Sequence, residues 1–561
     1  MRKWRLAAVT TLLVVMAVSC SDSSEIARSS SENIDSSVAS STSSTRPEAL
    51  SDLEDYSSAD ASSVPAEAAE AAAKSVAADS VAADSLSLPG GPPLGPPLEL
   101  EQNLTFQSSG VGSFVSAADD PLSTFSLDAD TASYDIAVYN IEHVGTLPNP
   151  DSVRVEDFLN SYPQGYPAVE PGLGVVLDGM AAPFHENALL LRVGVVPATD
   201  DTPRDPVTVI FIVDTSGSMS GTPLDTTKEI IKGVIAQLRP GDRAALVEYE
   251  SSARVITPPT DDINAVADAA ADLYTKGSTY AEQGIRVGYQ LAEAELERGH
   301  NVRMVLLSDG VGNVGQTDPE VILDTVGDWA QKGATLTTVG VGDSSWYYND
   351  VMLEVLANRG NGVYYYVRSV EAGRRFSDIA GNVLRESARD ARIQVEFNPQ
   401  AVDQWRLIGY ENRAVADEDF LDDSLDFGEV GFARPVTAIY EIITTDNSAG
   451  DMRLAEATVR WRDPRSQDVK SLSNQVDVGT IESGRESAHL THTAAVAELA
   501  EILRCSPYTE DTRINRVIDY INTTDATTVA YNSGFAELLS AASGLETHCS
   551  SDPAPQPESG K

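Results

Sequence analysis

The sequence predicts an α/β domain with a doubly wound, mostly parallel sheet, inserted into a β-rich, sandwich-like body. The first observation is a regular alternation of short apolar runs and amphipathic helical patterns from residue 207 onward. The second is a set of short alternating apolar stretches on both sides of that region, at 172–197 and 392–480. The third is a Ser-, Ala- and acid-rich stretch near the N-terminus, too poor in apolar residues to offset its ordering entropy.

These observations divide the chain of 561 residues into consecutive parts. We expect an export signal at 1–20, a flexible tether with a Pro-rich end at 21–117, an N-terminal β-rich flank at 118–206, the α/β domain at 207–370, a C-terminal β-rich flank at 371–485, a helical segment at 486–548 and a tail at 549–561.

Strands alternate with helices along the middle region. VTVIFIVD at 207–214 is typical of a buried strand, and the next helix, 223–238, presents one apolar face, formed by Ile230, Ile231, Val234, Ile235 and Leu238. The further strands expected are 244–251, 302–309, 334–342 and 362–367, and the further helices are 263–273, 280–299, 319–333 and 351–360. Ligands of such sheets bind outside the carboxyl ends of the strands, where strand order reverses.

The N-terminus carries a targeting signal. A basic MRKWR precedes an apolar run too short to span a bilayer, and Ala17-Val18-Ser19-Cys20 follows. This pattern resembles a bacterial lipoprotein signal, which implies lipidation of Cys20 and a membrane anchor outside the cytoplasm. The alternative is an ordinary secretory signal cleaved nearby.

The charge balance narrows the range of partners. A formal net charge of −46 leaves no basic surplus to neutralise phosphates, so nucleic acid and anionic membrane surfaces are excluded as partners. We interpret the many carboxylates as a surface that keeps the protein soluble. The alternative is that the protein functions beside divalent cations.

The C-terminal segment is predicted to be helical and crosslinked. Its apolar stripe of Ile514, Val517, Ile518 and Ile521 has helical spacing and indicates core packing. Apart from Cys20, the chain contains two cysteines, Cys505 and Cys549. In an exported chain an even pair favours a disulfide, with two buried thiols as the alternative.

Three motifs in the middle region suggest a nucleotide site, an aspartic protease or a serine nucleophile, but the residues around each motif argue against these functions. Residues 310–315 satisfy G-x-G-x-x-G, but Asp309 directly before them would repel a pyrophosphate, and the helix begins several residues later. Asp214-Thr215 follows a strand as in aspartic proteases, but no second such element exists. A serine nucleophile would need a histidine base, and none of the six histidines is expected at this edge of the sheet.

A metal site fits the residue types better. Asp214, Ser216 and Ser218 form D-x-S-x-S at the end of the first strand of the domain, and Asp309 ends another strand. Thr279, in Lys276-Gly277-Ser278-Thr279, offers a hydroxyl at a helix start, where a capping box with Glu282 is the alternative. Hard oxygen donors with few charges suit Mg²⁺, with Mn²⁺ or Ca²⁺ as alternatives.

D-x-S-G-S followed by G-S-T and S-D-G resembles the von Willebrand factor type A domain with its metal-ion-dependent adhesion site. The resemblance implies that Asp214, Ser216, Ser218, Thr279 and Asp309 surround one divalent cation, and that an acidic side chain of a partner completes its coordination. The flanks, with STFSLDADTASY at 123–134 and VEFNPQAVDQWRLIGYENRAVADEDF at 395–420, resemble those of a secreted or lipid-anchored bacterial subfamily. Asp128 and Asp130 in the first of these stretches suggest turn and capping roles rather than a second metal site.

The function expected is that of a cell-envelope lipoprotein, not an enzyme, that binds an acidic protein or glycan through a divalent cation. A metal-dependent hydrolase is the first alternative, with Glu248 or Asp343 as the general base. The second is an envelope assembly protein in which the metal only stabilises the fold.

Overall fold

The computed structural model describes residues 110–127, 129–170, 172–198, 204–310, 323, 326–330, 332–342, 350–376, 379–425, 427–431, 434–482, 487–509, 513–524, 529–530, 533–545 and 549. The export signal with Cys20, most of the tether, Asp128, Asp343 and the tail beyond residue 549 lie outside these residues.

The middle domain is built on a six-stranded sheet in the order β10-β9-β8-β5-β6-β7. Neighbouring strands are parallel except β7, which pairs antiparallel with β6 at the edge. The strands are β5 (Val207–Asp214), β6 (Arg243–Tyr249), β7 (Ala253–Thr260), β8 (Asn301–Ser308), β9 (Ala334–Val341) and β10 (Tyr364–Val367). The predicted doubly wound α/β architecture is confirmed.

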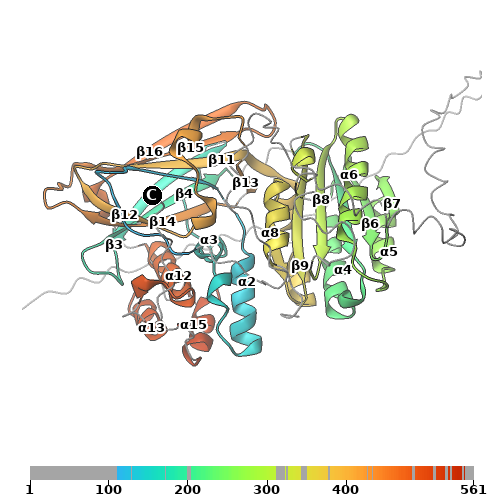
Figure 1. The fold of residues 1–561 in the computed structure, drawn as a ribbon, viewed down its shortest axis with the longest axis horizontal. Coiled ribbons are helices and arrows are strands. Elements are labelled where there is room, and N and C mark those ends of the chain that lie inside the picture. Colours follow the sequence, from blue (N-terminus) through green and yellow to red (C-terminus); the bar gives the residue numbers. More distant parts are fainter. Residues whose placement is uncertain are drawn as a thin grey trace, which may run out of the picture. The chain divides into compact units, whose positions relative to one another are not determined.

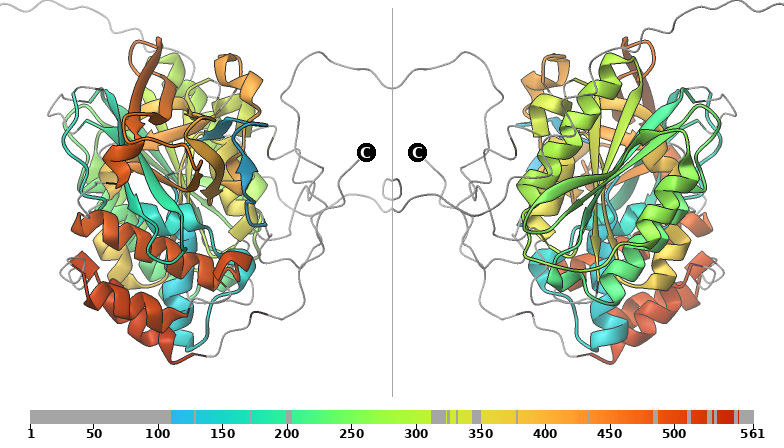
Figure 2. Two further views of the ribbon diagram at one scale, coloured as in Figure 1. Left: turned by 90° about the vertical axis from the view of Figure 1, so that its left-hand side faces the viewer. Right: turned by 90° about the vertical axis from the view of Figure 1, so that its right-hand side faces the viewer.

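Helices cover both faces of this sheet, as Figure 2 shows. One apolar core packs α6 (Ala281–Glu297) and α8 (Asp350–Arg359) against the strands. The other packs α4 (Thr222–Ile235), α5 (Ile263–Ala271), α9 (Val370–Arg375) and α10 (Ala380–Leu384). The domain therefore extends past the predicted boundary at residue 370, because α9 and α10 contribute apolar side chains to its core.

Strand β7 is an element that the sequence did not predict. Its sequence ARVITPPT contains two prolines, which cannot donate to a ladder and argue against a strand in the interior of a sheet. At the edge, with one side unpaired, the prolines are tolerated. In the predicted helix 319–333, residues 323 and 326–330 are helical, and the others lie outside the described residues.

The two flanks pair into one β-sandwich, as predicted. One sheet has the order β1-β12-β14-β4-β3, and the other has β13-β11-β15-β16 with β2 paired to β11. The N-terminal flank supplies β1 (Val115–Ser116), β2 (Leu122–Ser126), β3 (Leu173–Ala181) and β4 (Leu189–Pro197). The C-terminal flank supplies β11 (Glu386–Phe397), β12 (Val402–Ile408), β13 (Gly428–Gly431), β14 (Val436–Thr444), β15 (Arg453–Arg462) and β16 (Val469–Asp477). A single apolar core joins the sheets.

The folded body begins a few residues before the predicted boundary at 118. Val115–Ser116 pairs with β12, and Ala117 is fully buried. The N-terminal flank is also less purely β than expected, because it contains α2 (Ala132–Tyr139) and α3 (Val155–Asn160).

The C-terminal helices form a separate apolar core with these two N-terminal helices. Helices α12 (Ala488–Leu503), α13 (Ile514–Asn522) and α15 (Phe535–Ser543) pack beside α2 and α3 (Figure 1). A one-turn helix, α11 (Val478–Glu482), precedes them. The predicted stripe is core packing, since Ile514, Val517 and Ile521 are buried and Ile518 packs against the cluster.

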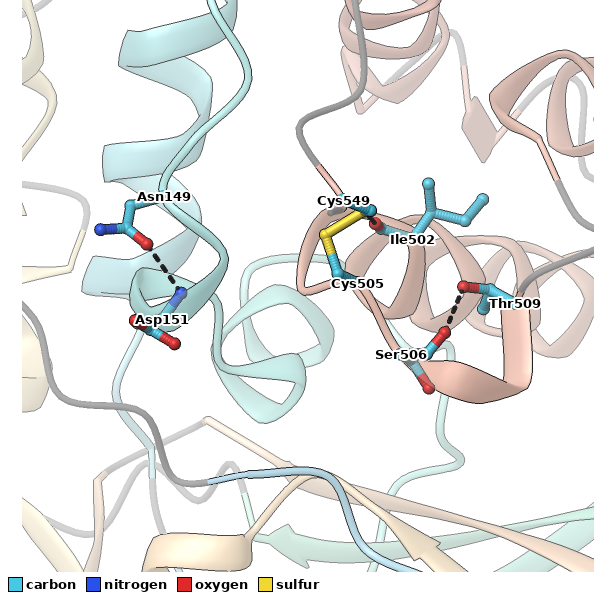
Figure 3. Close-up of a disulfide and its surroundings, with 7 residues drawn as sticks. All are labelled: Asn149, Asp151, Ile502, Cys505, Ser506, Thr509 and Cys549. Carbon is cyan, nitrogen blue, oxygen red and sulfur yellow. Dashed lines mark hydrogen bonds between the residues drawn. A yellow bond between two sulfur atoms is a disulfide. The ribbon is translucent and has the colours of Figure 1, made fainter. Parts of the chain in front are cut away.

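A disulfide joins Cys505, just after α12, to Cys549, with 5.4 Å between their Cα atoms (Figure 3). The predicted crosslink is therefore present in the structure. It closes a loop over a sequence separation of 44, within which α13 and α15 lie.

Removing this crosslink should destabilise the C-terminal helices. Replacing both cysteines by serine is expected to lower the free energy of unfolding by about 3–4 kcal/mol, the entropy of closing a loop of this length. Urea unfolding followed by circular dichroism measures the change, and wild-type protein with reductant should match the variant. An unchanged midpoint would show that the crosslink does not constrain this segment.

Candidate metal centre

Asp214 is the last residue of β5, and its carboxylate is completely buried. Its Oδ1 accepts a hydrogen bond of 2.8 Å from the backbone N–H of Ser216. Its Oδ2 accepts one of 2.9 Å from the hydroxyl of Ser308, the last residue of β8. Because β8 is the parallel neighbour of β5, the ends of the two strands meet at one edge of the sheet.

Two serines connect Asp214 to the second carboxylate. The Ser216 and Ser218 hydroxyls are 3.0 Å apart, and the Ser218 hydroxyl donates to Asp309 Oδ1 at 3.1 Å. Asp309 follows β8 and is nearly buried. Four of the five predicted ligands thus form one continuous set of contacts.

The loop that carries Thr279 is attached to the same place. The Lys276 N–H donates to the Thr215 carbonyl at 2.7 Å, and the Gly217 N–H donates to the Gly277 carbonyl at 3.3 Å. Gly277 has a φ of +67°, and a Cβ there would meet the Glu250 carboxylate at 2.0 Å, so the loop requires glycine at this position.

Thr279 itself is partly exposed and does not cap a helix. The N-cap of α6 is Tyr280, which makes no side-chain capping bond, so the capping box with Glu282 is not formed. Among the described residues no hydrogen bond involves the Thr279 hydroxyl, which leaves it available as a ligand.

The electrostatics of the site call for a positive charge. Burial, followed by repulsion from Asp214, raises the pKa of Asp309 to about 6. Burial also raises the pKa of Asp214, although hydrogen bonds from Ser216 and Ser308 oppose the shift. Within the described part of the chain, neither carboxylate has an ion-pair partner.

A divalent cation fits this donor set. The two buried carboxylates and the neighbouring hydroxyls are all hard oxygen ligands, and a bound cation would neutralise the negative charge of the carboxylates. The described residues contain no group of three or more His, Cys, Asp or Glu side chains placed to hold a metal, so hydroxyls must contribute to any site here.

The sequence did not single out two residues that shape the site. Ser308 orients Asp214 through its hydroxyl, and Thr215 fixes the loop by donating to the Tyr249 carbonyl at the end of β6. The serine directly before Asp309 was the available signal for the first. The role of Thr215 depends on the backbone carbonyl of Tyr249, and a backbone acceptor has no signature in the sequence.

The candidate general bases and the acidic pair in the N-terminal flank are placed differently. Glu248 is buried and forms ion pairs with Lys276, at 2.7 Å, and with Arg254. Asp130 is also buried and accepts from the Tyr364 N–H at 2.7 Å and from Arg413 at 3.3 Å. These contacts join distant segments and differ from the turn and capping role that the sequence suggested.

Fold and site together define a von Willebrand factor type A domain. The family model of that domain matches residues 209–311, a model described as von Willebrand factor matches 101–192, and the model described as "Uncharacterized protein YfbK, C-terminal" matches 382–545. A domain of this type indicates a protein-binding or adhesion type of role.

The comparison with whole proteins is more specific. YfbK of Escherichia coli (strain K12) is 31% identical over 463 residues, which cover 76% of this chain and 79% of YfbK. The chain therefore belongs to the family of von Willebrand factor type A domain proteins that includes YfbK.

Other similar proteins match less of the chain. The protein sll0103 of Synechocystis sp. is 29% identical over 215 residues, covering 38% of this chain and 50% of that protein. The solved structure of a von Willebrand factor type A protein from Catenulispora acidiphila covers 66% of this chain and 90% of that chain, with 15% identity and a TM-score of 0.43.

Proposed function

We propose that this protein binds an acidic partner, a protein or a glycan, through a divalent cation at the edge of the α/β domain. The residues that would hold Mg²⁺, or alternatively Mn²⁺ or Ca²⁺, are Asp214, Ser216, Ser218, Thr279 and Asp309. The observation that carries the proposal is the pair of buried carboxylates, Asp214 and Asp309, linked by serine hydroxyls and without a cationic partner among the described residues.

The composition of the donor set explains why a partner would be acidic. Three of the five donors are neutral hydroxyls, so only the two carboxylates bring negative charge. Because these carboxylates also accept hydrogen bonds, they would offset the double positive charge of the cation only in part. The cation, when bound, would attract a further carboxylate from outside. The chain's own residues orient and desolvate the site, since Ser308 and the Ser216 N–H hold Asp214 in place.

We further propose that the protein works outside the cytoplasm, anchored through a lipid on Cys20 and separated from the membrane by the tether. The support is the lipoprotein-like signal and the composition of residues 21–117. Within the described part of the chain, no helix combines the length and apolar character that crossing a bilayer requires.

A hydrolase is less well supported. Of the two candidate bases, Asp343 lies outside the described residues, and Glu248 is held between Lys276 and Arg254. We therefore propose a binding protein rather than an enzyme.

Capture of partners from the envelope fraction of the source cells tests the proposal. Immobilised protein should retain partners in Mg²⁺ and release them in EDTA, and an Asp214→Asn variant should retain none of them. If chelation lowers the melting temperature but every partner stays bound, the metal is structural. Metal-dependent turnover in a hydrolase panel would favour the enzyme instead.

Cation binding should weaken in acid. Because the pKa of Asp309 is about 6 in the cation-free protein, protons compete with the cation below that pH. Its folded pKa lies above the ordinary 3.8, so the cation-free protein loses stability as pH rises through 6, and a cation relieves this loss. The rise in melting temperature on adding Mg²⁺ should therefore be larger at about pH 7.5 than at about pH 5. An equal rise at both pH values would contradict the assignment of Asp309.

A further inference from the structure

Tyr249 is the last residue of β6, and its side chain is fully buried at the edge of the sheet that carries the metal centre. It is the register partner of Asp214, which ends the parallel neighbour β5. Paired residues of neighbouring strands point to the same face of a sheet, so both side chains belong to the face that α6 covers. The tyrosine ring packs so closely against α6 that a Cβ on Gly284 would come within 2.5 Å of it. Packing therefore fixes the place of the hydroxyl.

The hydroxyl of Tyr249 is buried, and among the described residues it makes no hydrogen bond. Such a group costs free energy and calls for an explanation. Burial, followed by the charge of Asp214, raises the pKa of Tyr249 well above its ordinary value, and the nearby Ser308 hydroxyl opposes the shift. The tyrosine therefore stays protonated, as a potential donor beside Asp214 and Ser308.

The contacts of Ser308 leave one acceptor short of a donor. Its hydroxyl oxygen lies 2.9 Å from Asp214 Oδ2 and also within hydrogen-bond distance of the Gly310 carbonyl. Both of these groups only accept when Asp214 is ionised, and a serine hydroxyl has one hydrogen to donate. If Ser308 donates to Gly310, then Asp214 Oδ2 needs another donor. Burial raises the pKa of Asp214, and the Tyr249 hydroxyl is one of the neighbours that oppose the shift.

We propose that the Tyr249 hydroxyl positions Asp214 as a metal ligand, by donating a hydrogen bond to its carboxylate when the cation is bound. The inference rests on the proposed function, because it concerns the same cation site. With one oxygen held by the Ser216 N–H and the other by Tyr249, the carboxylate keeps a single orientation. Groups that orient a ligand in this way strengthen metal binding without touching the metal. Strand β6 carries none of the five candidate ligands, so Tyr249 adds a further strand to the metal centre.

Removing only the hydroxyl separates this role from packing. Tyr249→Phe keeps the ring against α6, and calorimetric titration with Mg²⁺ and Mn²⁺ should show an affinity about tenfold below that of the wild type. In chelator, the melting temperature of the variant should be no lower than that of the wild type, because the lost hydroxyl makes no hydrogen bond with the described residues of the cation-free protein.

Absorption spectroscopy reports on the hydrogen bond itself. A tyrosine that begins to donate to a carboxylate changes its near-ultraviolet absorption, so Mg²⁺ should produce a tyrosine difference spectrum in the wild type that Tyr249→Phe lacks. Tyr289→Phe is the matched control, because Tyr289 on α6 is buried in the same core and its hydroxyl donates to the Val326 carbonyl at 3.5 Å. The control should change neither the affinity nor the difference spectrum.

The outcomes separate this inference from the proposed function. Equal cation binding by the wild type and Tyr249→Phe, or a full difference spectrum in the variant, overturns the inference and leaves the metal site standing. An equal loss of affinity in Tyr289→Phe also overturns it, since core packing would then explain both losses. If the wild type binds no cation, the proposed function and the inference fail together.

Discussion

An Asp214→Asn variant should lose divalent-cation binding by more than about 100-fold and still fold. Even residues that only support a metal ligand cost 10–100-fold when changed, so loss of a direct carboxylate ligand should exceed that range. The amide oxygen should still accept from the Ser216 N–H, and the amide NH2 group in place of Oδ2 should donate to the Ser308 hydroxyl, which itself donates to the Gly310 carbonyl. The substitution also removes a buried negative charge, that of the Asp214 carboxyl group, whose pKa is raised by burial.

The cation-free variant should therefore be at least as stable as the cation-free wild type. Calorimetric titration with Mg²⁺ and Mn²⁺ gives the affinities, and thermal unfolding with and without chelator gives the stabilities. Asp225→Asn is a matched control, because Asp225 is exposed in the first turn of α4, close in sequence to the site. Equal cation binding by wild type and Asp214→Asn would remove Asp214 from the site.

Arg406→Met should be the most destabilising single change in the β-sandwich, at about 3–5 kcal/mol. Arg406 on β12 is fully buried and donates to Glu441 on β14 at 2.6 and 2.9 Å, and to Glu501 on α12 at 2.9 Å. Its guanidinium also lies 4.0 Å from the centre of the Tyr508 ring. Although burial raises the pKa of Glu501, Arg504 and Arg406 hold it below its ordinary value.

Methionine would leave two buried carboxylates short of a counter-charge, at the junction of the sandwich and the C-terminal helices. Urea unfolding measures the loss, and Arg374→Met provides the comparison. Arg374 pairs with Glu371 in the open, with 58% and 65% of the side chains exposed, so its removal should cost under about 1 kcal/mol. Similar losses for both variants would show that the buried network does not hold the helices to the sandwich.

The sequence predicted the α/β domain well because each of its signals is local. A buried strand such as 207–214 reads as one apolar run, and parallel strands joined by helices bring their carboxyl ends to one edge. Asp214 and Asp309 could therefore be placed together although they are far apart in the chain. The hydroxyls of Ser216 and Ser218 came with the same local motif.

Features that depend on distant pairing could not be read in this way. The sequence around Arg406 contains no signal that this side chain forms ion pairs with Glu441 and Glu501. Strand β7 was hidden by its prolines, which only an edge position tolerates. The packing of α2 and α3 against the C-terminal helices joins segments more than 300 residues apart, and short helices carry weak patterns.

Anomalous diffraction from crystals of the protein soaked in Mn²⁺ would show directly where the cation binds. A single strong peak should lie among Asp214, Ser216, Ser218, Thr279 and Asp309, and crystals of Asp214→Asn should show no peak at this place. A peak elsewhere with none at these five residues, or an equal peak in the variant, would contradict the proposed metal site.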